Sequence, residues 1–359
     1  DPAYHDDIHS KVDINYENIK KSPTPNDVHS WQREHIKVDD QSPEGYPLNV
    51  IIDPAMREMY QVVHNSTLTN VFDRFSEQQP QCRFCVEGLS CQLCANGPCR
   101  IHPKAPRGVC GVDAHTMVAR NFTYRHVTIG TSANIFHAHQ AARTLKAAGE
   151  HPNSGLKIRD EEKLRKYAEM ASLDSSLPIH KLAVEFAQWV IDDIHRPSHD
   201  PSKMVELFAP TKRKELWKSL GLFPGGGYSE VALTQTKCMT NFTSDPIDFL
   251  LNSVRLGVAN EYQGLFALDI LQEILMGTQK ITIQKQNMGL LSPDMINIIT
   301  NGHMPLLAHV AIEMASSDEW QEKARQVGAN GIQIFGHVCE GQQLLNYSGT
   351  QSMRAYGGQ

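Results

Sequence analysis

Six of the eight cysteines lie within 29 residues, and this spacing is the feature of the sequence best suited to chemistry. They follow one another as Cys82, Cys85, Cys91, Cys94, Cys99 and Cys110. Thiolates are soft ligands, and an iron–sulfur cluster of either the [4Fe–4S] or the [2Fe–2S] type takes four protein ligands. The last four cysteines of the run provide one complete set. The run therefore predicts a protein built around low-potential electron transfer.

Cys82 and Cys85 then remain as half of a ligand set. A two-fold symmetric partner would supply the other half, because the same residues recur on both sides of a dimer axis. We therefore expect an iron–sulfur cluster shared between two copies of the chain. Zinc is the alternative, since CxxC pairs are common in zinc ribbons, but a ribbon usually spaces its second pair about 15–20 residues on. The irregular run of six favours iron and sulfur.

The composition limits the class of protein. The 359 residues are 40% hydrophobic and 21% charged, as in a soluble globular protein of two or three domains. The net charge of −6 argues against nucleic acid or an anionic membrane as the main partner. No stretch approaches the roughly 18–20 apolar residues of a membrane span. The chain begins without a secretory signal, and its clustered cysteines suit metal ligation better than disulfides, so we expect a cytoplasmic protein.

Apolar periodicity predicts the elements that position the cysteines. Residues 1–48 are polar and contain prolines, and we expect them to form an extended arm. Spacings of three and four predict helices over 53–75, 113–148, 160–172, 179–195 and 202–220, and two more within 245–277. Asp245 suits the N-cap, and Pro246 the first turn, of the first helix within 245–277. We assign 49–280 to a helical domain that carries the iron–sulfur loop at 81–111.

The pattern changes after residue 280. Short apolar strands at 295–299 and 331–335, with a helical stretch between them, predict a βαβ unit and so a parallel pair. His303 and Cys339 come just after these strands, where open α/β sheets bind their ligands. Alone, His303 would be a loop histidine, but its pairing with Cys339 favours metal ligation. The expected fold class is mixed α and α/β, a helical domain followed by the start of a Rossmann-like parallel α/β domain at 281–359.

Several motifs resemble, in the same order, the nickel-containing carbon monoxide dehydrogenases of anaerobes. They are CRFCVEGLSCQLCANGPCRI, GVCGVDAHTMVARNF, TNFTSDPIDFLL, INIITNGHMP and GANGIQIFGHVCEGQQLL, and they cover roughly residues 70 to 350. The resemblance implies reversible oxidation of CO with water to CO2, two protons and two electrons. It also implies a homodimer with three kinds of metal site, lettered B, C and D.

The resemblance implies a role for each candidate ligand. The [4Fe–4S] B cluster would be held by Cys91, Cys94, Cys99 and Cys110. Cys82 and Cys85 would hold the D cluster at the dimer axis. Their close spacing favours [2Fe–2S] over [4Fe–4S], because Ser90 stands where the more distant second cysteine of a [4Fe–4S] member would fall. His303 and Cys339 would hold the outer iron of the nickel–iron–sulfur C cluster, the active site.

The sequence departs from this family pattern in its longer N-terminal arm, in one histidine position and in its number of cysteines. Family members carry histidines at three-residue spacing after the ARN motif, the first of them an acid/base, but Asn134 stands at that position here. Asn cannot exchange protons near neutral pH. His137 at the second position and His139 nearby are therefore the candidates for proton transfer, with solvent-facing helix positions as the alternative. Four further C-cluster cysteines would come from beyond Gln359 or from another polypeptide. Cys238 matches no ligand, and we predict a buried free cysteine.

The expected partners and the competing functions also follow from the resemblance. Electrons would pass to a ferredoxin-type carrier. The arm at 1–48 is longer than the simplest members have, and members associated with acetyl-CoA synthase also carry extra N-terminal sequence, so that enzyme is a further expected partner. The related hybrid-cluster (prismane) type of hydroxylamine reductase is one alternative, although it has a single four-cysteine set. A non-catalytic iron–sulfur electron-transfer or scaffold subunit is the other.

Overall fold

The computed structural model describes residues 60, 69, 71–240, 242–278, 291–301, 305–337 and 352–353. The chain divides into two compact units, Asp1–Gln81 and Cys82–Gln359. In the first unit the structure describes helix α5 (Val71–Glu77), at the end of the helix predicted over 53–75. The predicted domain boundaries near residues 48 and 280 both fall outside the described residues and stay predictions.

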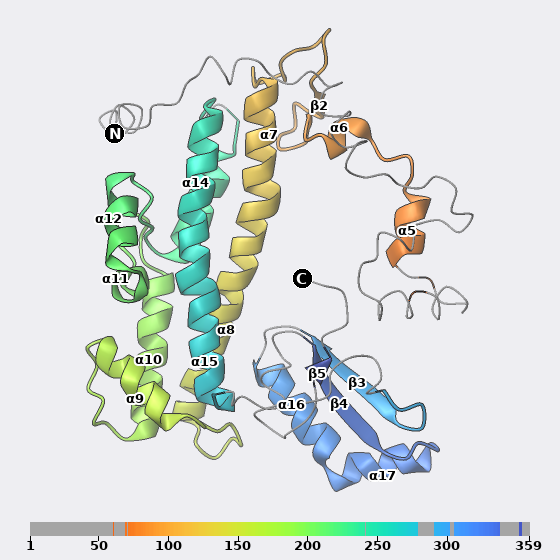
Figure 1. Cartoon of the computed structure of the whole chain (residues 1–359), viewed down its shortest axis with the longest axis vertical. Helices are drawn as coiled ribbons and strands as arrows, with labels where there is room; N and C mark the ends of the chain where they lie inside the picture. The colour runs from red at the N-terminus through yellow and green to blue at the C-terminus, as the bar shows by residue number, and fades with distance from the viewer. Residues whose placement is uncertain are drawn as a thin grey trace. The chain divides into compact units, whose positions relative to one another are not determined.

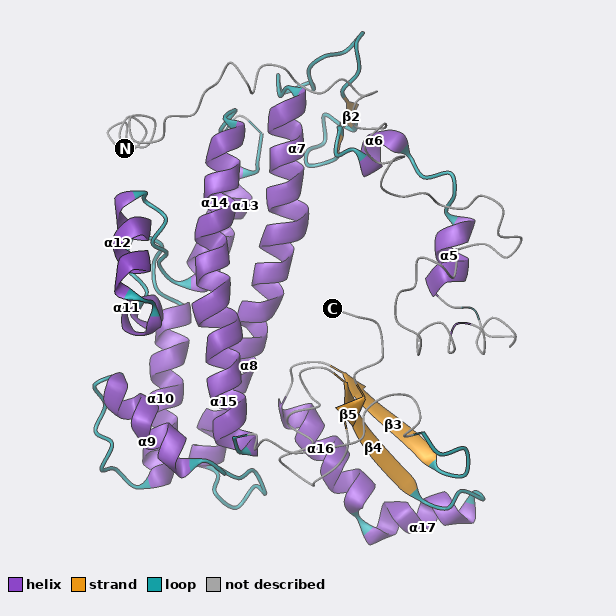
Figure 2. Ribbon diagram, viewed as in Figure 1, coloured by secondary structure: helices purple, strands orange, loops and turns teal. Residues whose placement is uncertain are grey.

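The second unit is mostly helical, as Figures 1 and 2 show. Its helices are α6 (Arg83–Val86), α7 (Ala114–Phe122), α8 (Ile129–Glu150), α9 (Glu161–Met170), α10 (Ile179–Ile194), α11 (Lys203–Phe208), α12 (Thr211–Ser219), α13 (Gly227–Lys237), α14 (Pro246–Ala259), α15 (Ala267–Met276), α16 (Pro305–Ser316) and α17 (Asp318–Gln326). Two π-helical segments, η1 (Thr123–Thr128) and η2 (Asn260–Phe266), join α7 to α8 and α14 to α15. The helices predicted over 113–148, 160–172 and 179–195 are confirmed.

The prediction of two separate helices within 245–277 is wrong. The chain stays helical throughout, because η2 continues α14 into α15 with right-handed helical backbone at both of its ends. A π segment holds one residue more per turn and shifts the register of the helix without breaking it. The predicted start is confirmed: the Asp245 side chain accepts a hydrogen bond from the Ile247 amide at 2.8 Å, and Pro246 opens the helix.

The single helix predicted over 202–220 is also wrong. Ala209 and Pro210 are extended and separate α11 from α12. Pro210 cannot continue a helix, because its nitrogen carries no hydrogen and its ring clashes with the preceding turn. Helix α13, which starts directly after Gly226, was not predicted. Gly226 is required there, since an added Cβ would lie 2.3 Å from the Arg196 carbonyl oxygen.

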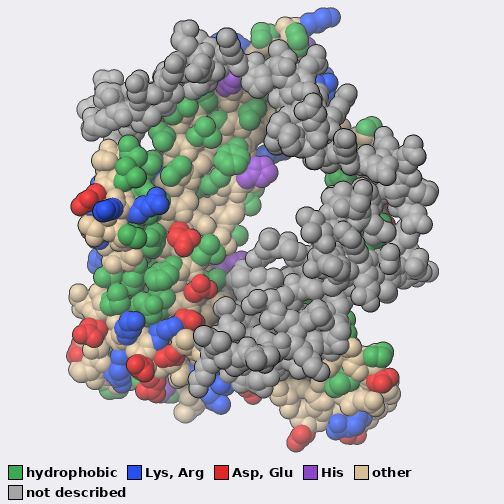
Figure 3. Space-filling view, in the orientation of Figure 1, with side chains coloured by type: hydrophobic (Ala, Val, Ile, Leu, Met, Phe, Trp, Pro, Cys, Tyr) green, Lys and Arg blue, Asp and Glu red, His purple; other side chains and the backbone are tan. Residues whose placement is uncertain are grey.

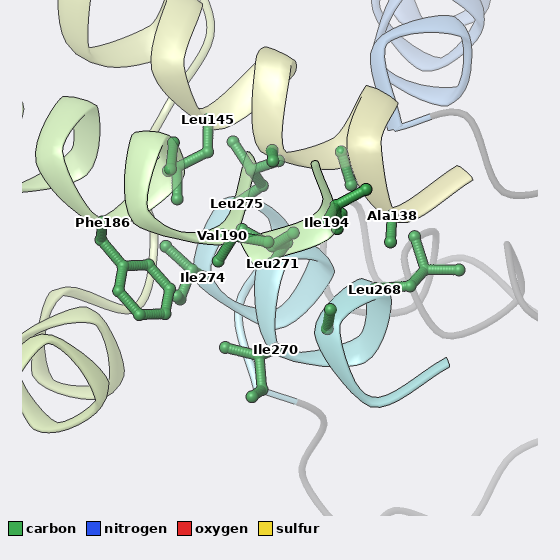
Figure 4. Close-up of a cluster of buried hydrophobic side chains, with 14 of the residues drawn as sticks. Ala138, Leu145, Phe186, Val190, Ile194, Leu268, Ile270, Leu271, Ile274 and Leu275 are labelled. Atoms are coloured by element: carbon green, nitrogen blue, oxygen red, sulfur yellow. The ribbon is translucent and has the colours of Figure 1, made fainter. Parts of the chain in front are cut away.

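The main hydrophobic core forms where α8, α10 and α15 pack together (Figure 4). The side chains labelled there are Ala138 and Leu145 of α8, Phe186, Val190 and Ile194 of α10, and Leu268, Ile270, Leu271, Ile274 and Leu275 of α15. Each is at most 3% exposed. Burying a large aliphatic or aromatic side chain stabilises a fold by about 1.5–3 kcal/mol. This core fixes the direction of α8, the helix that carries the predicted proton-transfer residues.

Two buried carboxylates tie the surrounding segments to this core. Asp193 at the end of α10 accepts hydrogen bonds from the Ser202 hydroxyl at 2.7 Å and the Gln263 side-chain amide at 2.8 Å. Glu230 of α13 pairs with Arg255 of α14 at 2.6 Å. A buried charge needs such partners, because taking it out of water alone is costly.

The predicted βαβ unit is confirmed. Strand β3 (Ile296–Asn301) pairs in parallel with β4 (Ile332–His337), and α16 and α17 lie between them in sequence. A third strand, β5 (Ser352–Met353), adds to β4 and was not predicted. The register sets Asn301 opposite His337, so the two long strands end side by side.

Part of the helical surface is apolar. Figure 3 shows hydrophobic side chains on the visible face of the molecule. The exposed large hydrophobic residues of the described chain include Leu250 and Val254 of α14 and Leu265 of η2. Among the described helices, none combines the length and the apolar character that crossing a bilayer requires.

Candidate functional site

The cysteine loop folds around a small antiparallel strand pair. Strand β1 (Ser90–Cys91) pairs with β2 (Cys99–Arg100), and the register sets Cys91 directly opposite Cys99. The chain between them turns back through Cys94, whose carbonyl accepts from the Gly97 amide at 3.1 Å. Opposite residues in an antiparallel pair lie within about 4.5–5.5 Å of each other. Two cysteines eight positions apart in the chain are thereby brought together.

The second pair of the four-cysteine set joins the first through packing. Cys91, Cys99 and Cys110 all belong to one cluster with Ile101, Val112 and Met117, the last from helix α7. An added Cβ at Gly97 would lie 3.2 Å from the Cys91 carbonyl oxygen and 3.4 Å from that of Cys94. Cys94 is thus held against the same strand pair. None of these cysteines forms a disulfide.

Gly108 leaves room beside Cys99 in the loop. A Cβ on Gly108 would lie 2.9 Å from a methyl of Val112 and 3.6 Å from the Cys99 Cβ. The following amide, of Val109, points at the Cys99 sulfur with an N to Sγ distance of 3.5 Å. Backbone amides that donate to sulfur stabilise negative charge on it, and such contacts tune iron–sulfur clusters. The loop therefore has the donors that an anionic thiolate site needs.

Helix α7 holds the loop through two consecutive side chains of the ARN motif. The Asn121 amide donates to the carbonyls of Gly88 and Ser90, both at 2.8 Å. Arg120 donates from Nη2 to the Cys91 sulfur at 3.2 Å. Only 2% of Arg120 is exposed, and its Nε has no hydrogen-bond partner. In the described part of the chain no carboxylate forms an ion pair with Arg120, and the Cys91 sulfur is the acceptor that its Nη2 faces.

These features fit an iron–sulfur cluster. A buried guanidinium requires negative charge close by, and thiolates bound to iron provide it. Cys91, Cys94, Cys99 and Cys110 are the right number and type of donors. Within the described ranges, no three His, Cys, Asp or Glu side chains stand close enough to hold one metal ion, so the fit rests on the donor types and on the buried Arg120 and not on converged sulfurs.

Sequence reasoning missed Arg120. The available signal was its position three residues after Met117, on the inward side of an amphipathic helix, where a charged side chain is unusual.

The remaining two cysteines of the run lie at the surface. Cys82 and Cys85 are both exposed, Cys82 as the N-cap residue of the short helix α6 and Cys85 within that helix. Hydrogen bonds from the backbone amide and then the side chain of Cys85 lower the pKa of the Cys82 thiol, with smaller effects of the Phe84 amide and the Arg100 charge. The Ser90 hydroxyl donates to the Cys85 sulfur at 3.3 Å. Both sulfurs are therefore accessible to a second chain, and the Cys82 thiol is the one favoured as a thiolate.

Cys238 lies apart from the loop cysteines. It is 2% exposed and packs with Ala119 and Phe249. Burial raises the pKa of its thiol to about 11. The prediction of a buried free cysteine is confirmed.

The two predicted proton-transfer histidines lie on α8 in different surroundings. Burial lowers the pKa of His137. Nδ1 of His139 is 3.0 Å from the Tyr228 hydroxyl, and its ring meets the His195 ring edge-on at 4.9 Å. Burial first, and then the charges of His195 and Arg143, lower the pKa of His139. Both side chains are half-buried, and their part in proton transfer stays a prediction.

The predicted outer-iron ligands, His303 and Cys339, lie outside the described residues. The strands that precede them are described, and they end next to each other at Asn301 and His337. The placement of the two ligands at one sheet edge stays a prediction.

Three comparisons agree on the relatives of this chain. The model of the Prismane/CO dehydrogenase family matches residues 89–358. A carbon monoxide dehydrogenase from Archaeoglobus fulgidus is 41% identical over 292 residues, which are 81% of this chain and 46% of that protein.

Two solved structures share the fold. A nickel-free carbon monoxide dehydrogenase from Thermococcus sp. AM4 superposes with a TM-score of 0.78 at 31% identity, over 86% of this chain and 49% of the other. A chain of an acetyl-CoA synthase/carbon monoxide dehydrogenase gives a TM-score of 0.78 at 28% identity, over 87% and 46%. The chain spans about half the length of the curated relatives it matches. Because the family match covers most of its length, this chain belongs to the Prismane/CO dehydrogenase family.

Proposed function

We propose that this chain is part of an anaerobic carbon monoxide dehydrogenase that converts CO and water to CO2, two protons and two electrons, reversibly. The observation that carries this proposal is the four-cysteine loop held against a buried arginine, in a chain whose relatives from Archaeoglobus fulgidus and Methanosarcina mazei bear that enzyme name. The alternative of a hybrid-cluster hydroxylamine reductase has no comparable support, because that type has one cysteine set and this loop has six cysteines.

The loop cysteines would hold two relay clusters. Cys91, Cys94, Cys99 and Cys110 would bind a [4Fe–4S] group, the B cluster, in the packed part of the loop. The exposed pair Cys82 and Cys85 would share a D cluster, [2Fe–2S] in preference to [4Fe–4S], with the same pair of a second copy. Their exposure supports this, since a ligand pair on a dimer axis must reach the surface of each protomer. Ser90, already bonded to the Cys85 sulfur, is not needed as a ligand.

The α/β part would supply His303 and Cys339 to the iron of the nickel–iron–sulfur C cluster, at the end of a Rossmann-like sheet starting near residue 281. When bound, that group supplies Lewis-acid activation of water and takes up the two electrons of the reaction. The protein's own task there is to place two donors on adjacent strand ends. The parallel register of β3 and β4 supports this placement.

Protons released by the reaction need carriers on the protein. We assign His137 and His139 to this task, because both keep their imidazoles neutral near pH 7 and so are able to accept a proton. His139 shares a hydrogen bond with Tyr228 and contacts His195, which offers an onward path. Asn134 cannot take part in such transfer.

The expected partners follow from the same proposal. Electrons would leave through the shared cluster to a ferredoxin-type carrier. One structural relative comes from an acetyl-CoA synthase/carbon monoxide dehydrogenase, which supports a related association for the arm at 1–48. A non-catalytic relay subunit is the second candidate, and Asn134 in place of an acid/base is the observation that favours it.

The decisive experiment is CO-dependent reduction of a viologen dye by the complete protein, purified without oxygen. Reduction that depends on CO, together with bound nickel, iron and sulfide, supports the dehydrogenase. The matched control is Cys94→Ser, which removes one relay ligand and should slow dye reduction by at least tenfold. Iron and sulfide without nickel or CO-dependent reduction would leave the relay subunit.

A further inference from the structure

We propose that Arg120 is the buried counter-charge of the cysteine loop and raises the reduction potential of the cluster held there. The inference rests on the proposed function, because it needs a cluster bound by Cys91, Cys94, Cys99 and Cys110. Arg120 is not a cluster ligand, but its charge would tune the potential at which the cluster transfers electrons.

Arg120 is a buried positive charge, and a bound cluster would supply the negative charge that compensates it. Arginine is almost never fully buried unless it is paired, and burying an unpaired charge costs several kcal/mol. Arg120 is 2% exposed, and across the described residues it has no carboxylate partner. Its Nε makes no hydrogen bond, while Nη2 points at the Cys91 sulfur at 3.2 Å. The missing negative charge therefore belongs on the sulfur side of the guanidinium.

A neutral thiol does not meet this need. The S–H group is only a weak acceptor, so it offers little to a buried cation. A thiolate bound in a cluster carries negative charge, and that charge grows by one when the cluster takes up an electron. Attraction to a nearby cation is strong in a buried site, since water does not screen it. Arg120 consequently stabilises the reduced cluster more than the oxidised one.

The fold holds this cation in place. Asn121, the next residue, bonds the carbonyls of Gly88 and Ser90 and so fixes the loop to α7. Asp113 caps the start of α7 by accepting from the Thr116 amide at 2.9 Å. With the helix capped and the loop fastened, the guanidinium has little freedom to swing away from Cys91. Cluster potentials respond to charge, to hydrogen bonds at sulfur and to burial, and Arg120 provides all three.

The test is a redox titration of the complete protein, purified without oxygen and followed by electron paramagnetic resonance. The relevant signal is identified as the one that is lost in Cys94→Ser. In Arg120→Met, which keeps the side-chain bulk and removes the charge, we expect the midpoint potential to become more negative. At a fixed potential the ratio of reduced to oxidised cluster should fall at least tenfold, which is about 59 mV for a one-electron couple.

Arg125→Met is the matched control. It removes the same charge from the same continuous helix, but Arg125 is exposed, so solvent and salt screen it. We expect its midpoint potential to equal that of the unaltered protein. Iron and sulfide contents are measured for every variant before titration.

Each outcome decides the matter. A full complement of iron and sulfide with an unmoved potential in Arg120→Met overturns the inference alone. If Arg120→Met does not fold or loses its cluster, Arg120→Lys is the deciding variant, because it keeps the positive charge. A Lys variant that keeps the cluster and its midpoint potential supports the inference. A Lys variant that loses the cluster as the Met variant does overturns the inference. An unaltered protein without iron and sulfide overturns the proposed function, and this inference with it.

Discussion

The side-chain amide of Asn134 donates a hydrogen bond to the side-chain oxygen of Asn260 at 3.0 Å, across the contact between α8 and η2. The two helices approach closely here, since an added Cβ on Gly264 would lie 3.1 Å from the Asn134 Cβ. Asn134 therefore acts in helix packing, at a position where the family resemblance leads one to expect an acid/base histidine. Proton transfer on α8 then depends on other residues.

This close approach predicts an asymmetry between two glycines of one continuous helix. Gly264→Ala should lower the free energy of unfolding by about 1–3 kcal/mol, because the new methyl pushes α8 and η2 apart. In Gly257→Ala the new methyl meets no atom within 4 Å, so the higher helix propensity of alanine should stabilise the fold by up to about 1 kcal/mol. Urea unfolding of both variants measures the difference. Equal effects would mean that the helices do not touch at Gly264.

Removal of the buried Glu230 carboxylate should be among the more destabilising single changes in the helical unit. Glu230 is 1% exposed and holds Arg255, so Glu230→Ala leaves a largely buried cation without its carboxylate. We expect a loss of about 3–5 kcal/mol in unfolding free energy. Glu319→Ala serves as control, because its ion pair with Lys323 is exposed and screened by water and salt. Similar losses in both variants would contradict the buried pair.

The surroundings of His139 predict a pH dependence of stability. Burial, His195 and Arg143 hold the pKa of His139 below its unfolded value of about 6.5. The unfolded state therefore binds the proton more readily, and stability falls as the pH drops below about 6.5 towards the folded pKa. Above that range His139 contributes no pH dependence.

His139→Gln should reduce this loss while keeping a group able to bond the Tyr228 hydroxyl. The measurement is the melting temperature at about pH 7.5 and about pH 5.5, on either side of the unfolded pKa. The drop between the two should be smaller in the variant than in the unaltered protein. An identical drop would show that His139 is not the group that resists protonation.

Cysteine reactivity should separate Cys238 from the loop. With its pKa at about 11 and a 2% exposed side chain, Cys238 should react with iodoacetamide at pH 8 only on unfolding. In metal-free folded protein, Cys82 and Cys85 should be modified first, since both are exposed. Peptide mass spectrometry after timed labelling gives the order. Labelling of folded Cys238 at the rate of Cys82 would contradict its burial.

Local spacing was enough to predict a large part of this protein. The number and close spacing of the six cysteines predict iron–sulfur ligation without any tertiary information, and that assignment stays a prediction. Apolar periodicity located α9 and α10 and the parallel strands β3 and β4, since each of these elements buries one regular face. The same spacing failed at Ala209 and within 260–266, where a proline and a π segment change the helix inside an unbroken apolar pattern.

The tertiary structure decided which distant residues share a site. Arg120 meets Cys91 across 29 positions, and Asn134 meets Asn260 across 126. His139 meets Tyr228 across 89. No local pattern contains these pairs, because each depends on how helices and loops pack once the main core has formed. The hydrophobic effect drives this packing but is not directional. The polar contacts form where the packed helices and loops bring complementary groups together.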